Sequence, residues 1–270
     1  MTEIVARKVT FDFPDHLDDV FPGDNPAMEC WLAAFSLTMP YLEPYLIRSM
    51  RSVVDELPEG ELASDVRAFV AQEAQHHRQH RKVNEIMKGQ LAPDVVARLE
   101  VIEQELEADY RRYTAEASTR FNLLYAEGFE AMTLAVVTRT FANVEADAAA
   151  GAPGRFGAWQ QLWAWHGAEE IEHRTVAFQV YEHVVGRYPY RVAGSIRAQV
   201  HYSRYLNRLM RVLLEANGHS THGLARGRQV FPPWWSKGGW QRHLRSFGPR
   251  YDPATVEVSP LVELVLSGYT

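Results

Sequence analysis

The chain of 270 residues contains a single cysteine, Cys30. One cysteine cannot form an internal disulfide, which excludes the disulfide-stabilised secreted domains and fits a reducing compartment. Long apolar runs are also missing, since none reaches the roughly 18 residues needed to cross a bilayer. The first residues lack the apolar core of a signal peptide. We therefore expect a cytoplasmic protein.

Acidic residues are scarce between positions 187 and 250, where twelve Lys or Arg accompany one acid, Glu215. A solvated basic face on a peripheral helix is the simplest interpretation, and a site for acidic substrates or an anionic surface is the alternative. Peripheral contact with a membrane surface stays open. Nucleic acid is not an expected partner, because no recognised binding motif accompanies the charge.

Alternating strand patterns are nearly absent, which predicts an all-α fold. We expect an N-terminal arm over 1–25, a helical domain over 26–218 that begins at Asn25-Pro26, and a C-terminal extension over 219–270 packed on the same domain. The extension is rich in Gly, Pro, Arg and Trp, including Trp234 and Trp235, and reads as loops and short helices. The expected helices cover about 27–57 (kinked or split at Pro40 and Pro44), 61–87, 92–113, 119–148, 155–185 and 190–216.

The most informative stretch runs from Trp165 to His173, within the helix predicted over 155–185. His166, Glu170 and His173 are spaced by four and then three residues, so they form one stripe on that helix. Burying imidazoles and carboxylates together is costly unless a divalent metal compensates their desolvation. This stretch therefore predicts half of a metal site, with Glu169 and Glu172 pointing away from it.

A second pair, Glu73 and His76, repeats the Glu-x-x-His spacing on the helix predicted over 61–87. Dimetal carboxylate bundles combine two such pairs with one Glu from each of two further helices. Glu43 and Glu130 are the candidates, because each is the charged residue of a mostly apolar stretch; Glu127, one turn before Glu130, competes with it. The resulting order and the connection of about 50 residues between the second and third site helices predict a ferritin-like bundle with an additional helix.

These motifs resemble two groups of proteins. The stretch from Phe69 to His80, with Trp165–His173, Glu43 and Glu130, resembles the bacterial family of predicted metal-dependent hydrolases, over about residues 20–255. His166, four residues before Glu170, is similar to the third histidine of p-aminobenzoate N-oxygenase-type diiron enzymes. The resemblance implies seven metal ligands: Glu43, Glu73, His76, Glu130, His166, Glu170 and His173. For His166, two roles stay open: metal ligand, or hydrogen-bond partner of a ligand. His80 is not among the seven and is expected to be a hydrogen-bond partner of a ligand or a substrate contact.

Four carboxylates balance two divalent metals, and the hard donors suit two Fe ions, with Mn or Zn as alternatives. Our first hypothesis is an O₂-dependent non-haem diiron oxidoreductase, an oxygenase or oxidase that acts on a small organic amine or an unactivated carbon. Glu43, Glu73 and His76 would hold one metal. Glu130, Glu170 and His173 would hold the other, with His166 as a further candidate ligand there. The alternatives are a dimetal hydrolase that uses metal-bound hydroxide and a non-catalytic metal-binding protein. Expected partners are an anionic or acyl-chain small molecule, an electron donor and, as a prior, a second copy in a homodimer.

Overall fold

The computed structural model describes residues 4–149, 157–221 and 239–269. Within these ranges every regular element is a helix and none is a strand, which confirms the all-α class. The elements and their bounds are α1 (Pro26–Arg51), η1 (Val54–Glu56), α2 (Glu61–Gly89), α3 (Pro93–Glu116), α4 (Thr119–Ala149), α5 (Ala158–Glu172), α6 (Val176–Val184), α7 (Tyr188–Ala216), α9 (Gly239–Ser246), η3 (Pro253–Thr255) and α10 (Leu261–Ser267).

The first helix begins where its local sequence predicts. The Asn25 side chain accepts a hydrogen bond from the backbone N–H of Met28, and Pro26 occupies the first helical position, where its missing N–H costs nothing. Proline opens α3 in the same way at Pro93. These starts carry their own signals in the sequence, so their positions were predictable.

Two prolines inside α1 do not split it. The helix continues through Pro40 and Pro44 to Arg51, so the predicted alternative of a split is wrong. A proline removes one helical N–H and leaves the carbonyl four residues earlier without its usual donor. For Pro40 that carbonyl belongs to Ser36, and the Asn84 side-chain amide donates to it at 2.8 Å. A side chain of α2 therefore replaces the missing backbone donor.

The prediction of one continuous helix over 155–185 is wrong, because this stretch contains two helices, α5 and α6. The C-cap of α5 is His173, whose φ of −93° and ψ of 8° lie outside regular helical values. Arg174 stabilises the break, since its guanidinium donates to the backbone carbonyls of Ile171 and Pro253. The break separates the metal-ligand motif from the apolar helix that follows.

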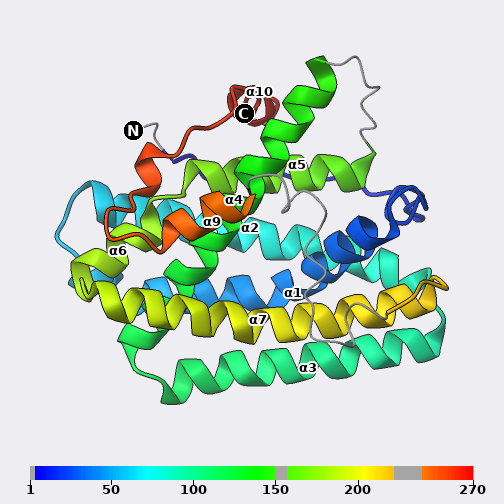
Figure 1. Ribbon diagram of the computed structural model, residues 1–270, viewed down its shortest axis with the longest axis horizontal. Helices are drawn as coiled ribbons and strands as arrows, with labels where there is room; N and C mark the ends of the chain where they lie inside the picture. Colours follow the sequence, from blue (N-terminus) through cyan, green and yellow to red (C-terminus); the bar gives the residue numbers. More distant parts are fainter. Residues whose placement is uncertain (1–3, 150–156, 222–238, 270) are drawn as a thin grey trace.

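Helix α1 lies at the centre of the bundle and packs against α2, α3, α4 and α7. Figure 1 shows α1, α3 and α7 running roughly side by side, while α4 crosses them steeply. The faces of these helices are lined by fully buried residues such as Leu37, Leu42, Phe69 and Leu209. α10 packs on α5 and α4, and α9 packs on α4. This arrangement places parts of α1, α2, α4 and α5 around one interior volume.

The N-terminal arm lies along α2, which holds it through glutamine side chains. Gln72 donates to the Val5 carbonyl and Gln79 donates to the Val9 carbonyl. The Gln90 side chain accepts from the Leu17 backbone N–H. Trp234 and Trp235 lie outside the described residues, and the domain boundaries stay a prediction. In the part of the chain that the structure describes, no helix is long and apolar enough to cross a membrane.

Candidate metal centre

The seven predicted ligands come together in the interior of the bundle. They lie on α1, α2, α4 and α5, with His173 at the end of α5. None of them is more than 6% exposed. Their donor atoms fall into two groups that could each hold one ion, and within each group the atoms lie within 4.8 Å of one another. The first group is Glu43, His76 and His166, and the second is Glu73, Glu130, Glu170 and His173.

The grouping differs from the expected one at two residues. Glu73 was expected with Glu43 and His76, but it lies in the group of Glu130, Glu170 and His173. The second difference is His166. The sequence placed this residue with Glu130, Glu170 and His173, whereas the structure places it with Glu43 and His76. The reason is helical geometry, because His166 lies a full turn before Glu170 and faces α1 and α2 there. Its Nε2 is 2.9 Å from Glu170 Oε1 and 3.6 Å from Glu43 Oε1.

Two carboxylates lie between the groups. One oxygen of Glu170 faces His166, and the other lies 3.4 Å from His173 Nε2. Glu73 Oε1 lies 3.7 Å from His76 Nδ1 and 3.4 Å from His173 Nε2. Glu73 and Glu170 are therefore the residues placed to bridge two metal ions.

The hydrogen bonding of these residues fits a bound metal. Eight buried ligand atoms have no hydrogen-bond partner: both oxygens of Glu43 and of Glu73, Glu130 Oε1, Glu170 Oε2, His76 Nδ1 and His173 Nε2. Buried polar atoms without partners are rare in folded proteins, because each costs about 1–3 kcal/mol or more. Metal ions would satisfy these atoms together, since all eight belong to the two donor groups.

The pKa shifts of these residues show that their buried negative charges are unfavourable without a metal ion. Burial raises the pKa of Glu43 well above its usual range, and the charges of Glu73 and Glu170 add to the shift. Burial and the Glu170 charge raise the pKa of Glu130 to about 8. Burial lowers the pKa of His173, but the charges and hydrogen bonds of Glu170 and Glu130 together outweigh burial and raise this pKa well above its usual range. Protons therefore compensate the carboxylates without metal, and metal binding would release them.

Each histidine has a hydrogen-bond partner on the ring nitrogen that points away from the centre. His76 Nε2 lies 3.0 Å from Glu169 Oε2, and His173 Nδ1 lies 2.9 Å from Gln72 Oε1. His166 Nδ1 lies 2.7 Å from His80 Nε2. Such partners fix ring orientation and tautomer in metal sites. The placement of His80 matches the expected ligand partner.

Arg7 of the N-terminal arm supports two of these contacts. Its guanidinium donates to both oxygens of Glu172 at 2.8 and 2.9 Å and to Glu169 at 3.3 Å. Gln72 donates its amide to Glu172 at 2.6 Å. The arm thus compensates two carboxylates that do not face the centre, as the sequence predicted for Glu169 and Glu172.

Glu127 does not join the centre, although it competed with Glu130 in the sequence. It accepts hydrogen bonds from Arg191 Nη1 and from Ser195 Oγ, each at 3.0 Å, and pairs α4 with α7. Glu130 Oε2 lies 3.5 Å from His173 Nε2 instead. The two carboxylates lie on nearly the same face of α4, so the contacts of Glu127 with α7, and not the helix rotation, separate their roles.

Sequence reasoning missed Arg7, Gln72, Ser36 and Asn84 as residues of this region. Arg7 and Glu172 are 165 positions apart, so no local pattern connects them. Asn84 carried a usable signal, because it continues the spacing of four from His76 through His80 on the face of α2 that bears the ligands.

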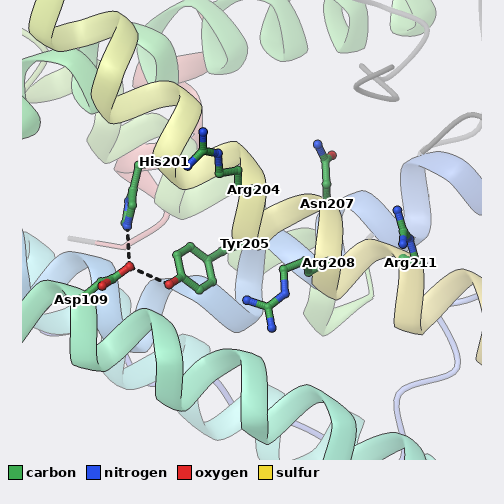
Figure 2. A pocket seen from close by; sticks show the side chains of 7 residues that line it. All are labelled: Asp109, His201, Arg204, Tyr205, Asn207, Arg208 and Arg211. Atoms are coloured by element: carbon green, nitrogen blue, oxygen red, sulfur yellow. Dashed lines mark hydrogen bonds and ion pairs between the residues drawn. The ribbon is translucent and has the colours of Figure 1, made fainter. Parts of the chain in front are cut away.

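A basic surface cavity lies apart from the centre, between α3 and α7. It has a volume of about 460 Å³ and is lined by Asp109, His201, Arg204, Tyr205, Asn207, Arg208 and Arg211. Figure 2 shows His201 and Tyr205 directed at Asp109, with distances of 3.0 and 2.6 Å. Its single acid is thus already paired, and none of the seven ligands contributes to its lining.

Comparison with known proteins gives one match. A family model described as "Predicted metal-dependent hydrolase" matches residues 5–257. Searches among curated proteins and among solved structures gave no match. The matched range includes all seven ligands and the arm residues that contact Glu169 and Glu172.

Proposed function

The chain belongs to the family of predicted metal-dependent hydrolases, and from this premise we propose that it is a hydrolase with two divalent metal ions. The observation that carries the proposal is the pair of facing donor groups with Glu73 and Glu170 between them. Four carboxylates contribute −4, which two divalent ions neutralise. Two bound ions would polarise the substrate and lower the pKa of a water molecule.

The residues of the chain would divide the work as follows. Glu43, His76 and His166 would hold one ion, and Glu130 and His173 would hold the other. The outer partners of the imidazoles would keep their donor atoms directed inward.

Aromatic rings would keep bulk water away from the imidazoles. Trp165 lies edge-on to His76, with ring centroids 4.9 Å apart, and Trp163 stacks on His166 at 5.7 Å. Excluding water strengthens the electrostatic interactions inside the site.

Metal content and turnover test the proposal together. Protein purified without added metal, then loaded with Zn²⁺ or Mn²⁺, is assayed against a panel of carboxylic and phosphate esters under air and under nitrogen. We expect two ions per chain and equal turnover in both atmospheres. We also expect that Glu170→Ala loses turnover, whereas a control remote from the centre, such as Glu107→Ala on α3, keeps it. Two bound ions without hydrolysis of any ester would contradict the proposal.

A second candidate function is O₂-dependent oxidation of a small organic amine or an unactivated carbon. The donor set favours it, because carboxylates and imidazoles without thiolate suit iron. Cys30 lies outside both donor groups, and burial raises the pKa of its thiol to about 12. Protein loaded with Fe(II) without oxygen and then exposed to O₂ would consume O₂ and change its near-ultraviolet absorption. No O₂ uptake would exclude this candidate, and inactivity in both assays would leave metal binding alone.

A further inference from the structure

A chain of buried hydrogen bonds connects α1 to the ligand His166, and it begins at Pro40. Because proline has no N–H, the Ser36 carbonyl four residues earlier lacks its helical donor. Asn84 Nδ2 donates to that carbonyl at 2.8 Å. The reverse orientation of the Asn84 amide would place two oxygen atoms 2.8 Å apart, so the backbone carbonyl determines which end of the amide faces it.

The orientation of Asn84 determines the direction of the next bond. Its Oδ1 lies 2.6 Å from Ser36 Oγ and can only accept, so the serine hydroxyl donates its single hydrogen there. Ser36 Oγ also lies 2.7 Å from His80 Nδ1. Since the hydroxyl hydrogen is already used, His80 Nδ1 must carry a hydrogen and donate it to Ser36.

The tautomer of His80 then determines that of His166. His80 is fully buried, and its ring nitrogens contact a hydroxyl and an imidazole, so a charged ring would have no carboxylate in hydrogen-bond contact. A neutral His80 with hydrogen on Nδ1 has a lone pair on Nε2, which accepts from His166 Nδ1 at 2.7 Å. His166 Nδ1 therefore carries a hydrogen. Its Nε2 lies 2.9 Å from Glu170 Oε1 and 3.6 Å from Glu43 Oε1, and a metal ion bound there would replace the hydrogen that Nε2 and Glu170 share in the metal-free protein.

We propose that Pro40, Asn84, Ser36 and His80 form a relay that fixes His166 in the tautomer able to bind metal through Nε2. Pro40, Asn84 and Ser36 are positioning residues, because they act on His166 through His80. The inference rests on the proposed metal centre for its purpose. Its content, a hydrogen held on Nδ1 of His166, is a property of the metal-free protein as well.

The tautomer is measured directly by nitrogen NMR of metal-free, full-length protein with ¹⁵N-labelled histidine, assigned with His166→Gln. We expect a protonated Nδ1 for both His166 and His80, and an unprotonated Nε2 for His80. A His166 ring without a hydrogen on Nδ1 would overturn the proposal. This measurement needs no variant of the relay, so it stays decisive even where a relay variant fails to fold.

Pro40→Ala tests the origin of the relay, and Pro44→Ala is its matched control. The alanine at 40 supplies an N–H that competes with Asn84 for the Ser36 carbonyl, whereas the alanine at 44 supplies one to the carbonyl of residue 40. We expect Pro40→Ala to bind its weaker Zn²⁺ ion several-fold less tightly and to show two His166 tautomers, although its resistance to urea does not fall. Pro44→Ala should show neither change. Unchanged affinity and a single tautomer in Pro40→Ala would overturn the proposal.

Ser36→Ala removes the middle of the relay, and Ser49→Ala is a matched control on the same helix. Ser49 is also buried, but its hydroxyl donates only to the Tyr45 carbonyl. Loss of such partners weakens metal binding by about 10–100-fold, so we expect at least about a tenfold loss of Zn²⁺ affinity in Ser36→Ala and none in Ser49→Ala. Equal affinity in both variants would overturn the proposal. If the unmodified protein bound no Zn²⁺, the proposed function would fail, while the tautomer measurement would still decide the relay.

Discussion

The close approach of α4 and α7 at Gly128 makes a sharp prediction about stability. A Cβ atom at this position would lie 2.7 Å from Ser195 Cα, which is backbone and cannot rotate away. Ordinary contact begins at 3.4 Å, so Gly128→Ala must move the helices apart by about 0.7 Å. Such overpacking costs about 1–3 kcal/mol, and replacing a helical glycine by alanine returns about 1 kcal/mol. We expect a net loss of up to about 2 kcal/mol.

Gly167→Ala is the matched control. Gly167 also lies in a helix, α5, but its surroundings leave room for an added Cβ atom. The nearest atom to its added Cβ is Phe141 Cε2 at 3.4 Å, so the variant should gain up to about 1 kcal/mol from helix propensity. The two alanine variants should therefore differ by about 1–3 kcal/mol, with Gly128→Ala the less stable. Urea unfolding of the metal-free proteins, followed by circular dichroism, measures this difference. Equal stability of the two variants would refute the close helix contact.

Three other predictions concern charges. Arg7→Met leaves the buried carboxylates of Glu169 and Glu172 uncompensated and should cost about 3 kcal/mol of unfolding free energy. Arg111→Met, at an exposed ion pair, should cost less than about 1 kcal/mol. Equal losses in urea unfolding would contradict a stabilising role for the ion pairs of Arg7. Glu130→Ala should reduce the bound metal, measured by mass spectrometry, from two ions to one, and Glu127→Ala should keep two ions; the reverse would exchange their assignments. Burial lowers the pKa of His201 below its usual 6.5. As the pH falls, His201 therefore binds a proton in the unfolded chain before it does so in the folded protein. The contribution of neutral His201 to the unfolding free energy is complete above pH 6.5 and is lost at lower pH. His201→Gln should therefore lose less unfolding free energy than the unmodified protein between pH 7.5 and 5.5.

Much of the helix pattern was predictable because its signals are local. Asn25 and Pro26 start α1, and the spacing of Glu73 and His76 places both on one face of α2. Glu43 and Glu130 were found because a lone carboxylate in an apolar stretch needs a partner. These inferences use only the chemistry of neighbouring residues, so the sequence was sufficient for them.

The rest depended on tertiary contacts. The break after His173 has no Gly or Pro to announce it, and it is stabilised by the contact of Arg174 with Pro253, far along the chain. Pro40 predicted a kink or a split, but an amide on α2 supplies the donor that the proline lacks. Glu127 and Glu130 could be distinguished only by their partners, since Arg191 of α7 claims the former. In each case a distant residue outweighs the local preference.

The clamp made by Arg7 has a consequence for how the protein is made. Arg7 is synthesised 165 positions before its partner Glu172. At roughly 5–20 residues per second, the ribosome needs about 10–30 s to supply that partner. During this interval the arm has neither Glu169 nor Glu172 to bind, and the three ligands on α1 and α2 lack the ligands of α4 and α5. The centre therefore cannot be completed before α5 has been synthesised, and closure of the arm over α2 and α5 waits for the same helix.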